Sequence, residues 1–323
     1  MRSLLAIFFL LPFAFLMPTP SLAVEAEAQI PGPALYVAPE LSVREISVAV
    51  TRKAVTSSFI VANDSPLTLH KQFCFSAPPQ WWFSPFFRDD AGFDDLALSV
   101  NGKPTALQKV YSAWFDGRDI TPELAKAKLP AYFGSAKSYS DIHAGKIGLD
   151  LEHPLFKKGY ILPSDFENGK TIWCPQWKVH QWFAFSHVFP AHGTANISWS
   201  YAPRVGYYYS SLHDHRFSEL VWDPREIETI LPKKDGDRYY LVVWLTVRLD
   251  SIPSPEPTKR VSLSVDWSNA ATEYYVSVMA GDKRAFGKDA VSLEVGNTPL
   301  SGEATFCMVR RLQEPPRGDN ALH

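Results

Sequence analysis

The stretch Leu67-Thr68-Leu69-His70-Lys71-Gln72-Phe73-Cys74-Phe75-Ser76-Ala77 indicates the fold class, because it alternates like a half-buried β-strand. The apolar side chains share one face, namely Leu67, Leu69, Phe73, Phe75 and Ala77. The other face carries Thr68, His70, Gln72, Cys74 and Ser76. A strand that is apolar on one side buries that side against another layer, so this stretch predicts a layered β protein.

Two further strands are expected immediately before this stretch. One ends at Val50, and the next covers residues 55–62. Turn-forming residues separate the strands, at 51–53 and in the cluster 63–66. Three consecutive strands joined by short turns are typical of a meander, so we predict an antiparallel sheet.

Strand signals continue along the chain and leave room for one or two short helices. Asn101-Gly102 is typical of a hairpin turn. Thr121-Pro122 indicates a helix start, with Thr121 as the capping residue, and a second short helix is expected from Pro224 to Pro232. We predict a mostly-β, antiparallel β-sandwich fold, as one long sandwich or, as we favour, two consecutive sandwich-like domains.

Residues 1–23 resemble an export signal. A positive charge at Arg2 precedes an apolar run of about fourteen residues, and small residues end at Ala23. Because this run is shorter than the roughly twenty apolar residues of a membrane-spanning helix, we expect cleavage near Ala23. The sequence then predicts a periplasmic or secreted protein whose mature chain has no integral membrane span.

The expected organisation follows from these signals. An extended lead-in covers residues 24–38, an N-terminal β-sandwich domain covers 39–206 and a C-terminal β domain covers 207–311. A flexible tail occupies 312–323. The whole chain has 32 Lys and Arg against 34 Asp and Glu, so nothing drives it toward nucleic acid, and we expect no nucleic-acid partner.

An aromatic segment follows the opening stretch and is the candidate ligand-binding site. Its rings are Trp81, Trp82, Phe83, Phe86 and Phe87. Two interpretations stay open. The rings close the end of the sandwich, or they are exposed and bind a sugar or a protein surface. The tryptophans Trp173, Trp177, Trp182 and Trp199 lie in expected strands and are predicted to be core.

A metal site is a second candidate. His213 and His215 would share one face of a strand and could hold one ion, with His187 or His192 as a further ligand. The alternative is a polar loop whose histidines face water. The acidic loop with Asp89, Asp90, Asp94 and Asp95 offers oxygen ligands for calcium, although its spacing favours a solvated turn. We predict no cofactor.

The three cysteines are Cys74, Cys174 and Cys307. An oxidising compartment would allow one disulfide between two of them, with one thiol left over. Sequence does not choose among the three pairings, and three unpaired thiols are the alternative.

Several short segments together resemble the exported bacterial proteins known as domain of unknown function 4424. They lie at 63–65 before 67–79, and at 98–104, 119–124, 177–182, 189–191 and 201–206, so the resemblance covers about residues 36–206. It implies no catalytic residue.

Two function classes follow from these observations. No nucleophile elbow, phosphate loop, H-E-x-x-H motif or dinucleotide fingerprint is present in the sequence. We therefore expect a non-enzymatic binding or interaction module of the bacterial cell envelope, with an envelope protein or glycan as partner. The alternatives are a hydrolase of envelope polysaccharide or peptide, with or without a metal ion, and a purely structural component.

Overall fold

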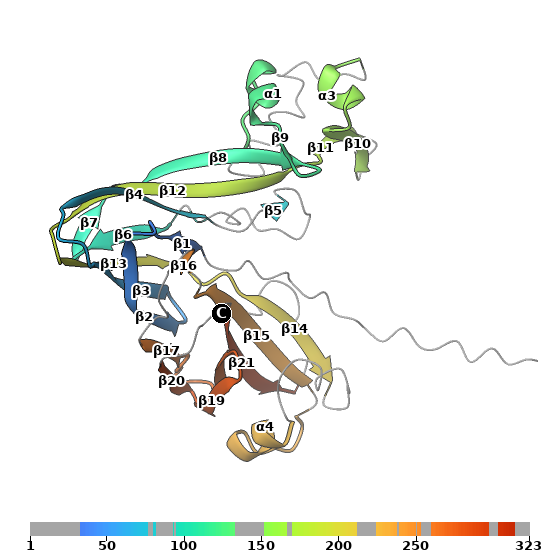
Figure 1. Ribbon diagram of the computed structural model, residues 1–323. Helices are drawn as coiled ribbons and strands as arrows, with labels where there is room; N and C mark the ends of the chain where they lie inside the picture. The colour runs from blue at the N-terminus through green and yellow to red at the C-terminus, as the bar shows by residue number, and fades with distance from the viewer. Residues whose placement is uncertain are drawn as a thin grey trace, which may run out of the picture.

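The computed structural model describes residues 33–76, 80–81, 93, 95–132, 152–166, 170–211, 224–237, 239–249, 251–252, 260–296 and 303–313. Strands dominate these residues (Figure 1) and form four sheets, which we call A to D. The helices of the described residues are short, namely α1 (Thr121–Lys126), α3 (Pro154–Lys157) and α4 (Pro224–Ile230). The predicted mostly-β, antiparallel fold with few helices is confirmed. None of the described helices is long and apolar enough to cross a membrane.

Sheets A and B are the two large layers. Sheet A has the order β16 (Ser251–Ile252), β1 (Ala34–Tyr36), β4 (Leu69–Ser76), β12 (Lys178–Phe189), β8 (Gln108–Phe115), β9 (Arg118–Asp119), with β5 (Gln80–Trp81) also paired to β12. Sheet B has the order β20 (Ala290–Gly296), β17 (Arg260–Asp266), β2 (Leu41–Thr51), β3 (Val55–Asn63), β13 (Thr194–Tyr201), β6 (Ala97–Val100), β7 (Lys103–Thr105).

Sheets C and D are smaller. Sheet C is the pair β10 (Ile161–Phe166) and β11 (Lys170–Pro175). Sheet D has the order β14 (Gly206–Ser211), β15 (Tyr239–Arg248), β21 (Glu303–Leu312), β18 (Tyr275–Ala280), β19 (Lys283–Lys288).

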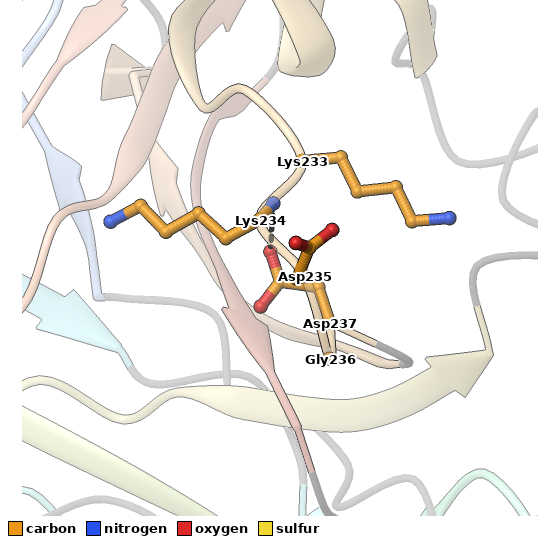
Figure 2. A pocket seen from close by; sticks show the side chains of 5 residues that line it. All are labelled: Lys233, Lys234, Asp235, Gly236 and Asp237. Carbon is orange, nitrogen blue, oxygen red and sulfur yellow. Dashed lines mark hydrogen bonds between the residues drawn. The ribbon is translucent and has the colours of Figure 1, made fainter.

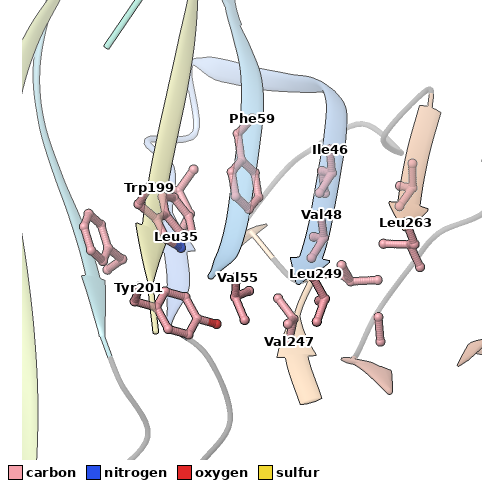
Figure 3. Packing of buried hydrophobic residues seen from close by; sticks show 14 of the residues in the cluster. Leu35, Ile46, Val48, Val55, Phe59, Trp199, Tyr201, Val247, Leu249 and Leu263 are labelled. Carbon is pink, nitrogen blue, oxygen red and sulfur yellow. The ribbon is translucent and has the colours of Figure 1, made fainter. Parts of the chain in front are cut away.

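Aromatic side chains fill the space between sheets A and B. Phe75 of β4 stacks on Phe183 of β12 with ring centroids 5.2 Å apart, and on Trp199 of β13 at 5.0 Å. Trp199 also stacks on Phe59 of β3 at 4.7 Å, and Figure 3 shows this pair beside the aliphatic side chains of β2. All four rings are buried. Because aromatic rings bury the largest areas, these contacts hold the two layers together.

The stretch at residues 67–77 forms β4 as predicted, but β4 belongs to a different sheet from β2 and β3. Phe73 and Phe75 are buried as expected, whereas Leu67 lies in the preceding turn and is 66% exposed. The meander holds for β2 and β3, which pair antiparallel. It is wrong for β4, which pairs with β1 and β12 in sheet A. The chain changes layers in the turn between β3 and β4.

Asn63 fixes this change of layer. Its side chain is 1% exposed and its Nδ2 donates to the carbonyl oxygens of Leu67 and Pro190, each at 2.8 Å. Its Oδ1 accepts the N–H of Ser65 at 3.0 Å. Pro190 follows β12, where the chain returns from sheet A to sheet B. One buried amide thus ties together the two turns that cross between the layers.

A β-bulge explains the irregular pattern at the start of β2. Leu41, Ser42 and Val43 are all buried, and strict alternation begins only at Ile46. The register against β3 shifts between Val43 and Glu45. One extra residue at this point returns the apolar side chains to the core face.

The predicted hairpin at Asn101-Gly102 is confirmed between β6 and β7. Both residues have positive φ, 51° for Asn101 and 75° for Gly102, as a two-residue turn of type I′ requires. The hairpin is short, because β7 ends at Thr105 and residues from Gln108 onward enter sheet A as β8.

Strands beyond residue 206 extend both large sheets. β16 pairs with β1 in sheet A, and β17 pairs in parallel with β2 in sheet B. One hydrophobic cluster contains side chains of both predicted domains, such as Phe59 from the first and Val247 from the second. The two blocks therefore share sheets and a core. A division into folding units near residue 206 stays a prediction.

Helices α1 and α3 pack on the end of β8 and β12 that lies beyond the sandwich (Figure 1). This second core contains Leu124 of α1, Leu155 of α3 and the fully buried Trp177. The helix predicted at Thr121 exists, but Thr121 does not cap it. Its hydroxyl accepts the N–H of Ala113 at 2.8 Å, and the Thr121 N–H is bound instead by Asp119 Oδ1 at 2.8 Å.

Candidate functional site

The outer face of β12 carries the candidate site. Along this strand Val179, Gln181 and Phe183 are buried, whereas the alternate residues Lys178, His180 and Trp182 are partly or fully exposed. The two faces follow from the two-residue period of a strand.

Three rings form a row across β8 and β12. The Trp114 ring of β8 lies 5.2 Å from the imidazole of His180, with their planes 28° apart. His180 in turn lies 6.2 Å from Trp182, at an angle of 24°. All three rings are partly exposed, and Trp114 Nε1 donates to the hydroxyl of Ser112 at 3.0 Å. We refer to Trp114, His180 and Trp182 as the aromatic row.

The imidazole of the row favours its neutral form. Partial burial lowers the pKa of His180 below its usual value of 6.5, and the positive charge of Lys178 acts in the same direction. The carboxylate of Asp119 opposes both. A neutral imidazole both donates and accepts hydrogen bonds, so the centre of the row has polar as well as stacking capacity.

The predicted aromatic segment begins beside this row. Its first tryptophan, Trp81, lies in β5, where its backbone pairs with Lys178 of β12, and Gln80 pairs with Val179. β5 therefore runs along the same strand that carries His180 and Trp182.

Phe93, the first described residue after the segment, also contacts β12. Phe93 is fully buried, and its N–H donates to Oε1 of Gln181 at 2.9 Å. Gln181 lies between His180 and Trp182 and is itself buried, and its Nε2 donates to the hydroxyl of Tyr111 at 3.3 Å. Both described flanks of residues 82–92 thus meet β12 within a few residues of the aromatic row.

Asp95 secures the returning chain. Its Oδ1 accepts from Arg204 Nη2 at 2.7 Å, and its Oδ2 accepts the N–H of Ala202 at 2.5 Å. The Arg204 guanidinium also lies 5.8 Å from the ring centroid of Phe93. The Asp95 carboxylate, considered above as a calcium ligand, is therefore occupied in holding the loop to the end of β13.

Several predicted site residues fall outside the described part of the chain. These are Trp82, Phe83, Phe86, Phe87, His213, His215, Asp89, Asp90 and Asp94. The proposed third ligands are described: His187 packs edge-on against Phe189, with centroids 4.8 Å apart, and His192 lies in the turn after β12. Within the described residues no group of three potential metal ligands comes together.

Two cysteines, Cys74 and Cys307, are free thiols, and the side chain of Cys174 lies outside the described part of the structure. Cys74 is partly buried on β4, and Cys307 is completely buried on β21 in sheet D. The structure therefore has no bond between Cys74 and Cys307, and a disulfide formed under oxidising conditions stays a prediction. Burial raises the pKa of both thiols, which keeps them protonated.

Sequence reasoning missed Trp114 and His180 and misjudged Trp182. Trp177 and Trp199 are buried as predicted, whereas Trp182 is partly exposed in the aromatic row. The alternation of residues 178–183 could have shown that Trp182 is exposed, because Trp182 lies on the same face of the strand as Lys178 and on the opposite face from Phe183.

A shallow hollow lies over the turn formed by residues 233–237 (Figure 2). The N–H of Lys234 donates to Asp237 Oδ2 at 2.9 Å within this turn, which lies between α4 and β15. The residues that line it come from a single turn, whereas the aromatic row combines two strands and lies beside both described flanks of the aromatic segment. We therefore place the candidate site at the row.

These features define a class: a mostly-β protein of two large packed sheets with an aromatic row on the outer face of one of them. Within that class, the chain belongs to the family described as domain of unknown function DUF4424, whose model matches residues 24–223. The match confirms the resemblance and extends beyond residues 36–206 at both ends.

Comparison with solved structures finds distant likenesses. A Legionella pneumophila protein, provisionally described as nutrient-binding, has 9% identity and a TM-score of 0.43, covering 88% of this chain and 72% of its own. The secreted serine protease VesC of Vibrio cholerae has 9% identity and a TM-score of 0.16, covering 84% and 46%. At these values neither likeness bears on function. Comparison with the curated proteins gives no match.

Proposed function

We propose that this chain is an exported binding protein of the bacterial cell envelope and that the aromatic row is part of its ligand-binding surface. One observation carries the proposal: both flanks of the aromatic segment, at Trp81 and at Phe93, attach to β12 beside the row. The segment between them holds Trp82, Phe83, Phe86 and Phe87. The proposal assigns these rings and the row to one ligand.

The chemistry of the row favours a glycan. Partly exposed indole rings provide stacking surface, and the Lys178 ammonium, the His180 imidazole and the Ser112 hydroxyl lie on the same face of the two strands. Flat apolar surface next to a few fixed polar groups suits a sugar ring, which has an apolar face and a rim of hydroxyls. The ligand class we propose is therefore an envelope oligosaccharide.

Binding can be tested by thermal shift and titration calorimetry with cell-wall fragments and oligosaccharides. A ligand that prefers the folded state raises the melting temperature in a saturable way. Trp114→Ala should abolish binding or weaken the affinity measured by calorimetry at least about tenfold, the scale expected when a stacking ring is removed. The thermal shift should shrink accordingly.

Phe286→Ala is the matched control, because Phe286 is an aromatic residue 43% exposed on sheet D, away from the row. It should leave binding unchanged. Equal binding by the Trp114 variant and wild type would contradict the proposed surface, and a panel without any shift would contradict a glycan ligand.

Export is a separate part of the proposal and rests on residues 1–23. Expression in a bacterial host should yield a periplasmic protein whose mass corresponds to a chain beginning at Val24. An intact leader on protein recovered from the cytoplasm would contradict it.

A further inference from the structure

β20 forms one edge of sheet B. It pairs antiparallel with β17 over its whole length, from Ala290 opposite Asp266 to Gly296 opposite Arg260. Among the described residues, β17 is the only strand that pairs with β20. The other side of β20 is therefore an edge, and a strand edge presents unpaired backbone groups.

The residues that present these groups follow from the ladder. The N–H of Trp267 donates to the carbonyl oxygen of Asp289 at 2.8 Å, just before β20 begins. Backbone groups in an antiparallel ladder point alternately toward and away from the partner strand. Counting in twos from Asp289, the odd-numbered residues of β20 face β17. Ser292 and Glu294 direct their N–H and C=O groups outward.

Ala290 agrees with this count. Its carbonyl oxygen lies 3.0 Å from the position a Cβ would take on Gly287 of β19, so this even-numbered residue also points away from β17. β19 therefore approaches the start of the edge, at Ala290 and Val291. The open part is the stretch from Ser292 to Glu294.

The side chains of β20 leave this edge unprotected. Val291 and Leu293 pack against the hydrophobic core but are only partly buried, and Ser292 and Glu294 are exposed on the opposite face. The strand contains no proline, no lysine and no β-bulge, three of the features that prevent another strand from adding to an edge, and its one charged side chain, Glu294, is paired with Arg260.

We propose that β20 is a self-association surface, at which two copies of this chain pair antiparallel with Leu293 on the two-fold axis. In this register Ser292 lies opposite Glu294 of the second copy. All the outward backbone groups of Ser292 and Glu294 then find partners across the axis. Sheet B continues from one copy into the other.

The sequence of β20 favours a second copy over an unrelated strand. Its apolar and polar positions are symmetric about Leu293, with Val291 matching Val295 and Ser292 matching Glu294. A two-fold interface brings the same surface of both copies together and needs this kind of self-complementarity. The two Leu293 side chains meet beside the core.

Charge does not oppose this arrangement. The carboxylate of Glu294 is paired with Arg260 of its own chain, with Nε and Oε2 3.1 Å apart. The two glutamates near the axis are therefore each accompanied by a guanidinium.

Opposite charges placed at Ser292 give the sharpest test. Ser292→Glu puts a carboxylate directly across from Glu294 of the second copy, and by symmetry it does so twice. Ser292→Lys puts an ammonium there. Directly opposed like charges destabilise a strand pair and unlike charges stabilise it. The association constant of the dimer should therefore fall about tenfold with Ser292→Glu and rise with Ser292→Lys.

The measurement is sedimentation equilibrium of the purified full chain over a range of concentrations, with circular dichroism to confirm folding. Ala97→Glu and Ala97→Lys are the matched controls, because Ala97 is exposed on β6, which four strands separate from β20 in sheet B. They should leave the equilibrium unchanged. Ser292→Pro removes an outward N–H without breaking the ladder to β17 and should give a monomer.

Two results would overturn the proposal. One is a wild-type protein that stays monomeric at every attainable concentration. The other is a dimer whose association constant responds equally to Glu and Lys at Ser292, or to neither. Glycan binding at the aromatic row is independent of both outcomes.

Discussion

Replacing Gln181 by leucine tests the joint between the aromatic segment and the sandwich. Gln181 is 5% exposed, accepts the N–H of Phe93 at 2.9 Å and donates to the Tyr111 hydroxyl at 3.3 Å. Leucine fills a similar volume but makes neither hydrogen bond. The substitution therefore isolates the polar contacts from the packing.

The expected loss follows from the burial of Phe93. Phe93 is fully buried, so its N–H loses a partner at a site away from solvent, which costs about 1–3 kcal/mol. The Tyr111 hydroxyl is only partly buried, and its bond is longer, so water replaces it at smaller cost. We expect Gln181→Leu to lower the free energy of unfolding by about 2 kcal/mol.

Two measurements check this value. Urea unfolding gives the global free energy, and hydrogen exchange reports the protection of the Phe93 amide, which should fall in the variant. Gln108→Leu is the matched control, because Gln108 is exposed on β8 and its replacement should change stability by less than about 0.5 kcal/mol. Unchanged Phe93 exchange in Gln181→Leu would refute the proposed joint.

Three further predictions follow from the described contacts. Asn63→Ala removes three hydrogen bonds of a buried amide and should cost about 3 kcal/mol in urea unfolding, with a loss under about 1 kcal/mol arguing against the tie between turns. In alkylation of the folded protein Cys74 should react slowly and Cys307 not at all, and both should react after unfolding without reductant. A cysteine that reacts only after reductant is added would show a disulfide and contradict this prediction. Burial lowers the pKa of His180 and His187 below 6.5, so the unfolded chain takes up protons first as the pH falls. The contribution of these two histidines to the free energy of unfolding is therefore complete above pH 6.5 and is lost as the pH falls below it. The double variant His180→Gln with His187→Gln should show a smaller drop in melting temperature between about pH 7 and pH 5 than the wild type.

Local patterns predicted much of the secondary structure, because the residues that determine them are neighbours. The alternation of β4, the turn at Asn101-Gly102 and the helix starting at Pro224 were all readable in this way. The layer to which β4 belongs was not. It depends on Asn63 meeting Pro190, which lies 127 residues further along the chain.

The candidate site shows the same division. The density of rings at Trp81 identified the aromatic segment from composition alone. The row could not be recognised, because Trp114 meets His180 only through the register in which Trp114 lies opposite Lys178. No local pattern encodes a register between strands so far apart in the chain.

Residues 177–182 show why the fold and the proposed binding surface cannot vary independently. Odd-numbered Trp177 and Val179 fill the core beneath the helices, and Gln181 holds Phe93. Even-numbered His180 and Trp182 face outward in the row. A one-residue slip would exchange these sets, burying the rings and exposing the core, so odd-position packing fixes the register that the row requires. Substitutions at even positions should therefore change binding before stability, and substitutions at odd positions should change stability first.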